Sequence, residues 1–202
     1  MTLPRIPYSR LRFYHFVDVD DQELGTLEDV ILDPHSLTPT HIVLGGGFFE
    51  EFMESKGEID DIDEIASLDL VDRIDNDFIV LKTKLEDLET TDSHGNLPIE
   101  GYKYTDFLKY PLSDRNGAID GEIVDFVFDE NDSLIIVHYP EVEQKMKLEG
   151  YMQKFEFHVP IDKVSVTDKI VEIDIDREML FELIKEQVEI RMNGKSAVLL
   201  PK

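Results

Sequence analysis

The sequence contains no cysteine and no tryptophan, and lysine and arginine together account for only 20 of its 202 residues. Without cysteine the chain forms no disulfide, no thiolate metal site and no thiol nucleophile. No stretch approaches the roughly 20 apolar residues that a membrane-spanning helix needs. The first residues, Met1 to Arg5, lack the apolar region of a secretory signal peptide. We therefore expect a cytoplasmic protein with no membrane span.

Acidic residues dominate the charge of the chain. Aspartate and glutamate number 45, which gives a formal net charge of -25 at pH 7. Affinity for nucleic-acid phosphates comes from clustered lysine and arginine, and so does adhesion to anionic membranes. We therefore expect no direct nucleic-acid binding, and we expect a protein partner with a basic surface instead. The hydrophobic content of 42% still allows a buried core.

The chain contains an internal repeat. Residues 21–33 align without a gap on residues 117–129, which matches Gly25 with Gly121 and Asp29 with Asp125. Each copy continues with further apolar runs and closes with a similar pair of runs. The residue offset between the two copies is smaller at their closing runs than at their first runs, so the second copy is shorter in the middle. We assign the difference to an insertion around Phe48 that lengthens the first copy.

Each copy has the pattern of several short β-strands. Runs of valine, isoleucine, leucine and phenylalanine are bounded by glycine, aspartate, asparagine and proline, which favour turns. Short strands in so few residues leave exposed edges unless the sheet closes. We therefore predict a mainly β protein made of two tandem small β-barrels.

The sequence also predicts where the two domains lie. The segment 91–98 is polar, rich in turn residues and free of periodicity, as expected of a linker. We assign domain 1 to residues 1–90 and domain 2 to residues 99–202. Domain 2 ends with a predicted helix over 176–192, because Asp176 is a suitable N-cap and an apolar stripe follows it. An edge strand is predicted over 197–200.

These residues resemble a known family. The pattern Asp21-x-x-Leu-Gly25-x-Leu-x-Asp29-Val-Ile-Leu-Asp33, followed by Thr40-His-Ile-Val-Leu44 and a glycine-rich turn, resembles the PRC-barrel. The closing strands, including Val159-Pro-Ile-Asp-Lys-Val164, are similar as well. PRC-barrels occur in the H subunit of photosynthetic reaction centres, in a bacterial ribosome-maturation factor and in archaeal cell-division proteins. The turn Gly45-Gly-Gly-Phe-Phe resembles archaeal members.

The resemblance implies a non-enzymatic interaction or adaptor module, such as a cell-division or assembly scaffold. One alternative is an accessory factor in ribosome maturation that acts through a ribosomal protein. A second alternative is a metal-dependent hydrolase that uses the acidic loops. The chain lacks the membrane helix, the long coiled coil and the second type of domain found in those relatives. The sequence leaves the oligomeric state open, with a homodimer as one option.

Candidate catalytic and metal-binding residues are few. His41 and His138 occupy comparable predicted strands, which fits either a shared metal or proton-handling position or ordinary histidines of the wall. Asp29 and Asp125 recur, and we favour a backbone-bonding role over acid–base catalysis. The acidic stretch 18–21 lacks the glycine and glutamate of a calcium loop. We predict no catalytic residue, no metal ligand and no cofactor.

The segment from Phe48 to Met53 is the predicted partner-binding site. Phe48, Phe49, Phe52 and Met53 share one face of a short predicted helix, and eight of the fifteen residues from 50 to 64 are acidic. Such a segment is either a lid on the barrel or part of the seam between barrels, or a docking patch in which aromatics anchor a basic partner.

The charge of the chain generates a first prediction. At physiological salt the protein should show no measurable binding to duplex DNA or structured RNA, because no basic stripe is present to release counterions. A filter-binding assay with both nucleic acids tests this. Salt-sensitive RNA binding with a micromolar dissociation constant would contradict it.

Overall fold

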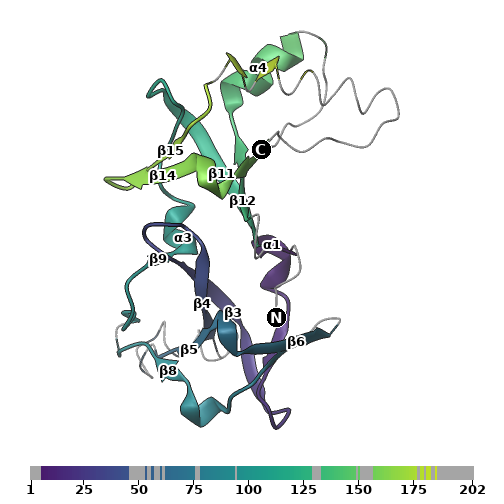
Figure 1. The fold of residues 1–202 in the computed structure, drawn as a ribbon, viewed down its shortest axis with the longest axis vertical. Helices are drawn as coiled ribbons and strands as arrows, with labels where there is room; N and C mark the ends of the chain where they lie inside the picture. The colour runs from purple at the N-terminus through teal and green to yellow at the C-terminus, as the bar shows by residue number, and fades with distance from the viewer. Residues whose placement is uncertain are drawn as a thin grey trace. The chain divides into compact units, whose positions relative to one another are not determined.

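The computed structural model divides the chain into two compact units (Figure 1). Unit 1 comprises residues 1–106 and 128–130, and unit 2 comprises residues 107–127 and 131–202. The structure describes residues 6–45, 53, 56, 60, 62–75, 78–93, 95–128, 133–148, 150, 157–176, 178, 179, 181, 182 and 185. These residues form two multistranded sheets and three short α-helices, so the prediction of a mainly β fold is confirmed.

Unit 1 is built on a sheet with the strand order β6-β7-β2-β3-β4-β5-β8, and β9 pairs with the end of β3. Its strands are β1 (Ile6–Pro7), β2 (His15–Val17), β3 (Glu23–Leu32), β4 (Pro39–Gly45), β5 (Glu64–Ser67), β6 (Val71–Asp75), β7 (Phe78–Leu81), β8 (Glu89–Thr90) and β9 (Tyr102–Lys103). Its helical turns are α1 (Tyr8–Leu11), η1 (Leu68–Leu70), η2 (Leu85–Asp87) and the start of α3 (Tyr104–Phe107).

Unit 2 contains a sheet with the order β13-β12-β11-β10-β15-β14. Its elements are β10 (Leu112–Ser113), β11 (Ile119–Phe128), β12 (Leu134–His138), α4 (Pro140–Leu148), β13 (Phe157–Pro160), η3 (Ile161–Lys163), β14 (Val164–Thr167) and β15 (Ile170–Ile173). Read from β14, this order repeats that of unit 1 from β6 to β5. The parallel pairs β2–β7 and β10–β15 also correspond. The two copies of the internal repeat therefore share one strand order.

The longest strand of each unit contains the same irregularity. A β-bulge lies between Leu27 and Asp29 in β3, and another lies between Ile123 and Asp125 in β11. The Asp29 Oδ1 atom accepts a hydrogen bond from the next backbone amide at 2.7 Å, and Asp125 does the same at 2.8 Å. Both aspartates are buried. The carboxylate satisfies a backbone donor at the bulge, which is the structural role that we favoured.

The length difference between the copies lies elsewhere than predicted. Leu27 and Ile123 pair with Leu44 and Val137, so the register places the extra residues of the first copy in the turn between β3 and β4. The connection from β4 to β5 is as long as that from β12 to β13. The interpretation of the Phe48 segment as an insertion is therefore wrong.

Unit 1 extends beyond the segment that the sequence marks as a linker. Within 91–98, Thr91 is buried; its amide donates to the Asp63 carbonyl and its hydroxyl accepts from the Asp63 amide, both at 2.9 Å, so this end of the segment packs on unit 1. Strand β9 then pairs with Ile31 and Leu32 of β3. A side chain at Gly101 would place its Cβ atom 2.8 Å from the Leu32 carbonyl oxygen, so only glycine allows this approach. The compact unit ends at Asp106.

We call residues 101–106, which pack on unit 1, the docked segment. Tyr104 and Thr105 hold it in place. The Thr105 amide donates to Asp29 Oδ1 at 3.2 Å, and its hydroxyl donates to Asp29 Oδ2. The Tyr104 ring is fully buried, with its centroid 4.3 Å from that of Tyr8 and 6.5 Å from that of Phe128. Burial raises the pKa of the Asp29 carboxyl, and the bonds from Thr105 and Val30 partly oppose this rise.

The contact between Thr105 and Asp29 generates a prediction about stability. Replacing Thr105 with valine keeps its shape but removes a donor from a buried carboxylate, which should cost about 1–3 kcal/mol. A raised pKa means that folding favours the protonated carboxyl, so stability falls as pH rises through this pKa. Because the hydroxyl of Thr105 lowers this pKa by favouring the charged carboxylate, the cost of Thr105→Val should grow from acid to neutral pH in urea unfolding experiments.

Asp29→Asn is the matched control for this experiment. Asparagine keeps an acceptor oxygen for the amides of Val30 and Thr105 and carries no charge. Its stability should lack the pH dependence that Asp29 contributes. A cost of Thr105→Val that is the same at every pH would contradict the assignment.

Candidate functional site

The two units provide an internal comparison, because they share one strand order. A polar residue that recurs in both units has a role in the shared fold. A residue that only one unit carries is not required by that fold, and such residues are the candidates for function.

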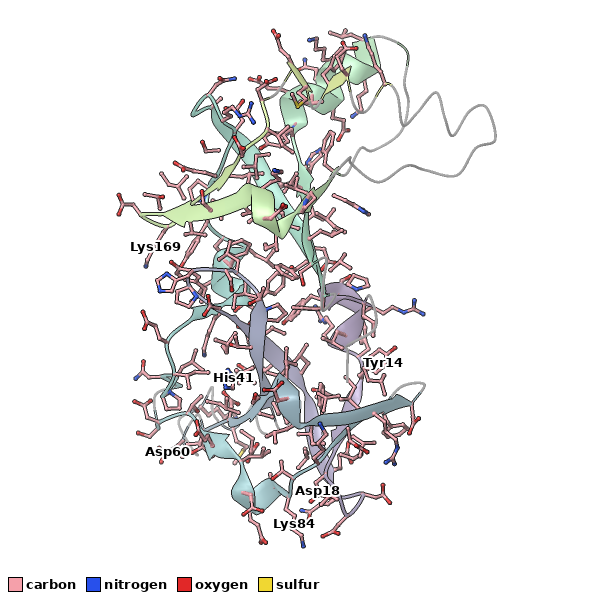
Figure 2. All side chains as sticks on the ribbon, in the orientation of Figure 1. Tyr14, Asp18, His41, Asp60, Lys84 and Lys169 are labelled. Atoms are coloured by element: carbon pink, nitrogen blue, oxygen red, sulfur yellow. The ribbon has the colours of Figure 1, made fainter. Side chains whose placement is uncertain are left out.

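The acidic loop at residues 18–21 has a structural role. The Asp18 Oδ1 atom accepts hydrogen bonds from the amides of Asp20 and Gln22 at 2.8 and 2.9 Å, and these amides lower the pKa of Asp18. Asp114 makes the same turn in unit 2, with its Oδ1 atom 2.9 Å from the Asn116 amide. Asp20 bonds to Lys84 at 2.7 Å, and Figure 2 shows Asp18 and Lys84 at the same end of unit 1.

The two strand histidines do not share a position. His138 pairs with Glu122 on β11, and the corresponding pair in unit 1 is Gly45 with Thr26. His41 corresponds instead to Leu134, because the turn before β4 is longer than the turn before β12. The interpretation of His41 and His138 as a shared metal or proton-handling position is therefore wrong.

His138 is the centre of a charged cluster in unit 2, and Gly45 and Thr26 occupy the corresponding strand positions of unit 1. Its Nδ1 atom lies 2.8 Å from Glu122 Oε1 on β11, and its Nε2 atom lies 2.5 Å from Glu143 Oε2 on α4. The other carboxylate oxygen of Glu143 accepts a hydrogen bond from Lys147, one turn further along α4. His138 and Glu143 are largely buried, whereas Glu122 is 63% exposed. The cluster joins β11, β12 and α4.

The chemistry of this cluster follows from its donors and acceptors. A carboxylate oxygen faces each ring nitrogen of His138, so both nitrogens are engaged within the cluster. The Lys147 ammonium and then His138 lower the pKa of Glu143. A histidine bonded in this way has no free nitrogen for a metal or a substrate proton. The cluster therefore holds α4 on the sheet.

The predicted partner-binding segment is described only in part. Met53 is helical and half-buried. Phe48, Phe49 and Phe52 lie outside the described residues, so their role in binding stays a prediction. Within the described ranges no group of three histidine, aspartate or glutamate residues is arranged to hold a metal ion.

The start of the predicted C-terminal helix is present. Asp176 Oδ1 accepts a hydrogen bond from the Met179 amide at 2.7 Å, which is an N-cap contact. Phe181 is buried, and the ammonium groups of Lys145 and Lys185 lie 4.0 and 4.5 Å from its ring centroid. The stripe residues Leu180, Ile184 and Val188 and the predicted edge strand 197–200 lie outside the described residues.

Comparison with known proteins adds no identity. No family model matches the sequence, and no curated protein matches it. The resemblance to PRC-barrels therefore stays a prediction that depends on the repeated motif. In the part of the chain that the structure describes, no helix has the length and apolar character needed to cross a membrane.

Sequence reasoning missed the roles of Glu122 and Glu143. A detectable signal was the position of Glu143 in the first turn of a helix that begins with Pro140, directly after the strand that carries His138. The contact between His138 and Glu122 depends on the register of β12 against β11. The turn before β12 is shorter than the turn before β4, so an alignment of the two copies does not show this register.

The His138 cluster generates a prediction. Replacing His138 with alanine removes a hydrogen bond from the largely buried Glu143 and should cost about 1–3 kcal/mol in thermal unfolding at neutral pH. Glu122→Gln should cost less than about 1 kcal/mol, because that carboxylate is exposed.

The effect of His138→Ala should depend on pH. A lowered pKa stabilises the fold above the ordinary value of 4.5 for Glu143, and this contribution is lost as pH falls through the pKa in the folded protein. The difference between His138→Ala and the parent should therefore shrink in acid. An equal difference at every pH would show that His138 acts through packing alone.

Proposed function

We propose that the chain is a non-enzymatic adaptor, built from two tandem PRC-barrel-like domains, that binds a protein with a basic surface. The observation that carries this proposal is the use of the recurring carboxylates. Asp29 and Asp125 bond to backbone amides at the bulges, and Asp18 and Asp114 do so in the turns. The carboxylates that recur in both copies are engaged in hydrogen bonds to backbone amides. Their role is therefore structural, which favours a non-enzymatic protein.

Charge supports the choice of partner. A net charge of -25 attracts a basic protein over long range and repels nucleic acid and anionic lipid. The acidic stretch from 50 to 64 begins among the aromatic residues of the Phe48 segment. In such a site aromatic side chains supply most of the affinity and carboxylates supply steering and register.

The Phe48 segment can be tested directly. Phe48→Ala and Phe52→Ala should abolish capture of a basic partner from an extract of the native organism, with little change in thermal stability. Phe13→Ala is the matched control, since Phe13 is 68% exposed and lies outside the segment. Captured ribosomal proteins would favour a role in ribosome maturation, and captured division proteins would favour a scaffold of cell division.

Stability measurements distinguish a docking patch from a lid. If Phe48 and Phe52 belong to the core, each alanine variant should lose roughly 3–5 kcal/mol of stability. Such a loss, measured by urea unfolding, would show that this segment belongs to the core and is not the binding site.

A further inference from the structure

One face of the unit 1 sheet carries exposed aromatic side chains. Strands β6, β7, β2 and β3 are neighbours in the sheet, and their register places Asp75, Phe78, His15 and Thr26 side by side. We name this row, with Glu23 beside His15, the aromatic face.

The two rings of the aromatic face are in contact and open to solvent. The Phe78 and His15 ring centroids lie 5.7 Å apart with an interplanar angle of 36°. Phe78 is 48% exposed, and the side chain of His15 is 46% exposed. His15 Nδ1 lies 3.2 Å from Glu23 Oε1, which holds the imidazole against the sheet. A phenylalanine in the middle of four strands thus presents much of its ring to water.

The shared fold does not require these rings. In unit 2 the parallel pair β10–β15 corresponds to β2–β7, and its register places Pro111 and Ile170 at the positions of His15 and Phe78. The Pro111 carbonyl accepts a hydrogen bond from the Val171 amide at 2.9 Å, so the parallel pairing is kept with these residues. Unit 2 has isoleucine where unit 1 exposes phenylalanine, so the aromatic ring is not needed for the pairing of these strands.

Carboxylates flank the aromatic face on both sides. Glu23 on β3 is 69% exposed, and Asp75 on β6 is 58% exposed. Arg73 bonds to Asp75 at 2.8 Å and lies 3.5 Å from Asp72, so these three side chains together keep one net negative charge. A ring between two acids is suited to a cation, which is attracted to the ring face and to the carboxylates together.

We propose that the aromatic face binds an extended basic segment of the partner protein, with an arginine or lysine over the Phe78 ring. This proposal rests on the proposed adaptor function. Glu23 and Asp75 lie three strands apart, or roughly 14 Å at the usual spacing between strands. An extended segment rises about 3.3 Å per residue, so basic residues about four positions apart reach both carboxylates. The face thus recognises alternating basic residues across the strands.

A binding experiment with the full chain tests this proposal. The probe is a fluorescein-labelled glycine–serine peptide that carries arginine at three alternate positions, measured by anisotropy at physiological salt. Phe78→Ile supplies the residue that unit 2 uses and should keep the fold. It should weaken binding about 2- to 5-fold, the range that one exposed cation–π contact contributes. Phe13→Ala should leave binding unchanged.

The outcomes separate this proposal from the adaptor function. If the parent binds the peptide and Phe78→Ile binds equally well, the aromatic face is excluded while the adaptor function stands. Equal weakening by Phe13→Ala would likewise exclude it. If the parent shows no saturable binding, the aromatic face is excluded as a site for basic segments, and the capture experiment with Phe48→Ala and Phe52→Ala still decides the adaptor function. Peptide-induced shifts of the His15 imidazole resonances, absent in Phe78→Ile, would support the face.

Discussion

The carboxylate of Asp29 sits where the longest strand of unit 1 breaks its regular pairing, and three donors hold it there. The amides of Val30 and Thr105 and the hydroxyl of Thr105 offset the cost of burying this acid. The same contacts fix the end of β3 against β9 and place the ring of Tyr104 in the core. One buried acid thus connects local strand geometry to the packing of a distant segment.

Beyond this shared framework, the two units differ in what they present. Unit 1 exposes an aromatic ring between acids, where unit 2 has Ile170. Unit 2 uses a histidine and two glutamates to hold a helix where unit 1 has Gly45 and Thr26. Duplication preserved the carboxylates that satisfy backbone amides and left other positions of the sheet free to change.

The repeat and its turn residues were sufficient to predict the mainly β fold and its duplicated strand order. Glycine and aspartate mark turns and bulges through local backbone chemistry, which a sequence records directly. The pairing of His138 with Glu122 depends on register, and the longer turn of unit 1 shifts that register. The sequence also contains a signal for the docked segment. Tyr104-Thr105 precede Asp125 by the same number of residues as Tyr8-Ser9 precede Asp29, which marks these residues as part of the repeat.

The position of residues 101–106 bears on how such a protein arises. These residues belong to the second copy by sequence, yet they complete the packing of unit 1. The break between copies therefore falls inside a folded body. A single ancestral copy of unit 1 would have lacked residues equivalent to 101–106 at the end of β3. Such a copy would have needed its own leading segment or a segment of another molecule at that position.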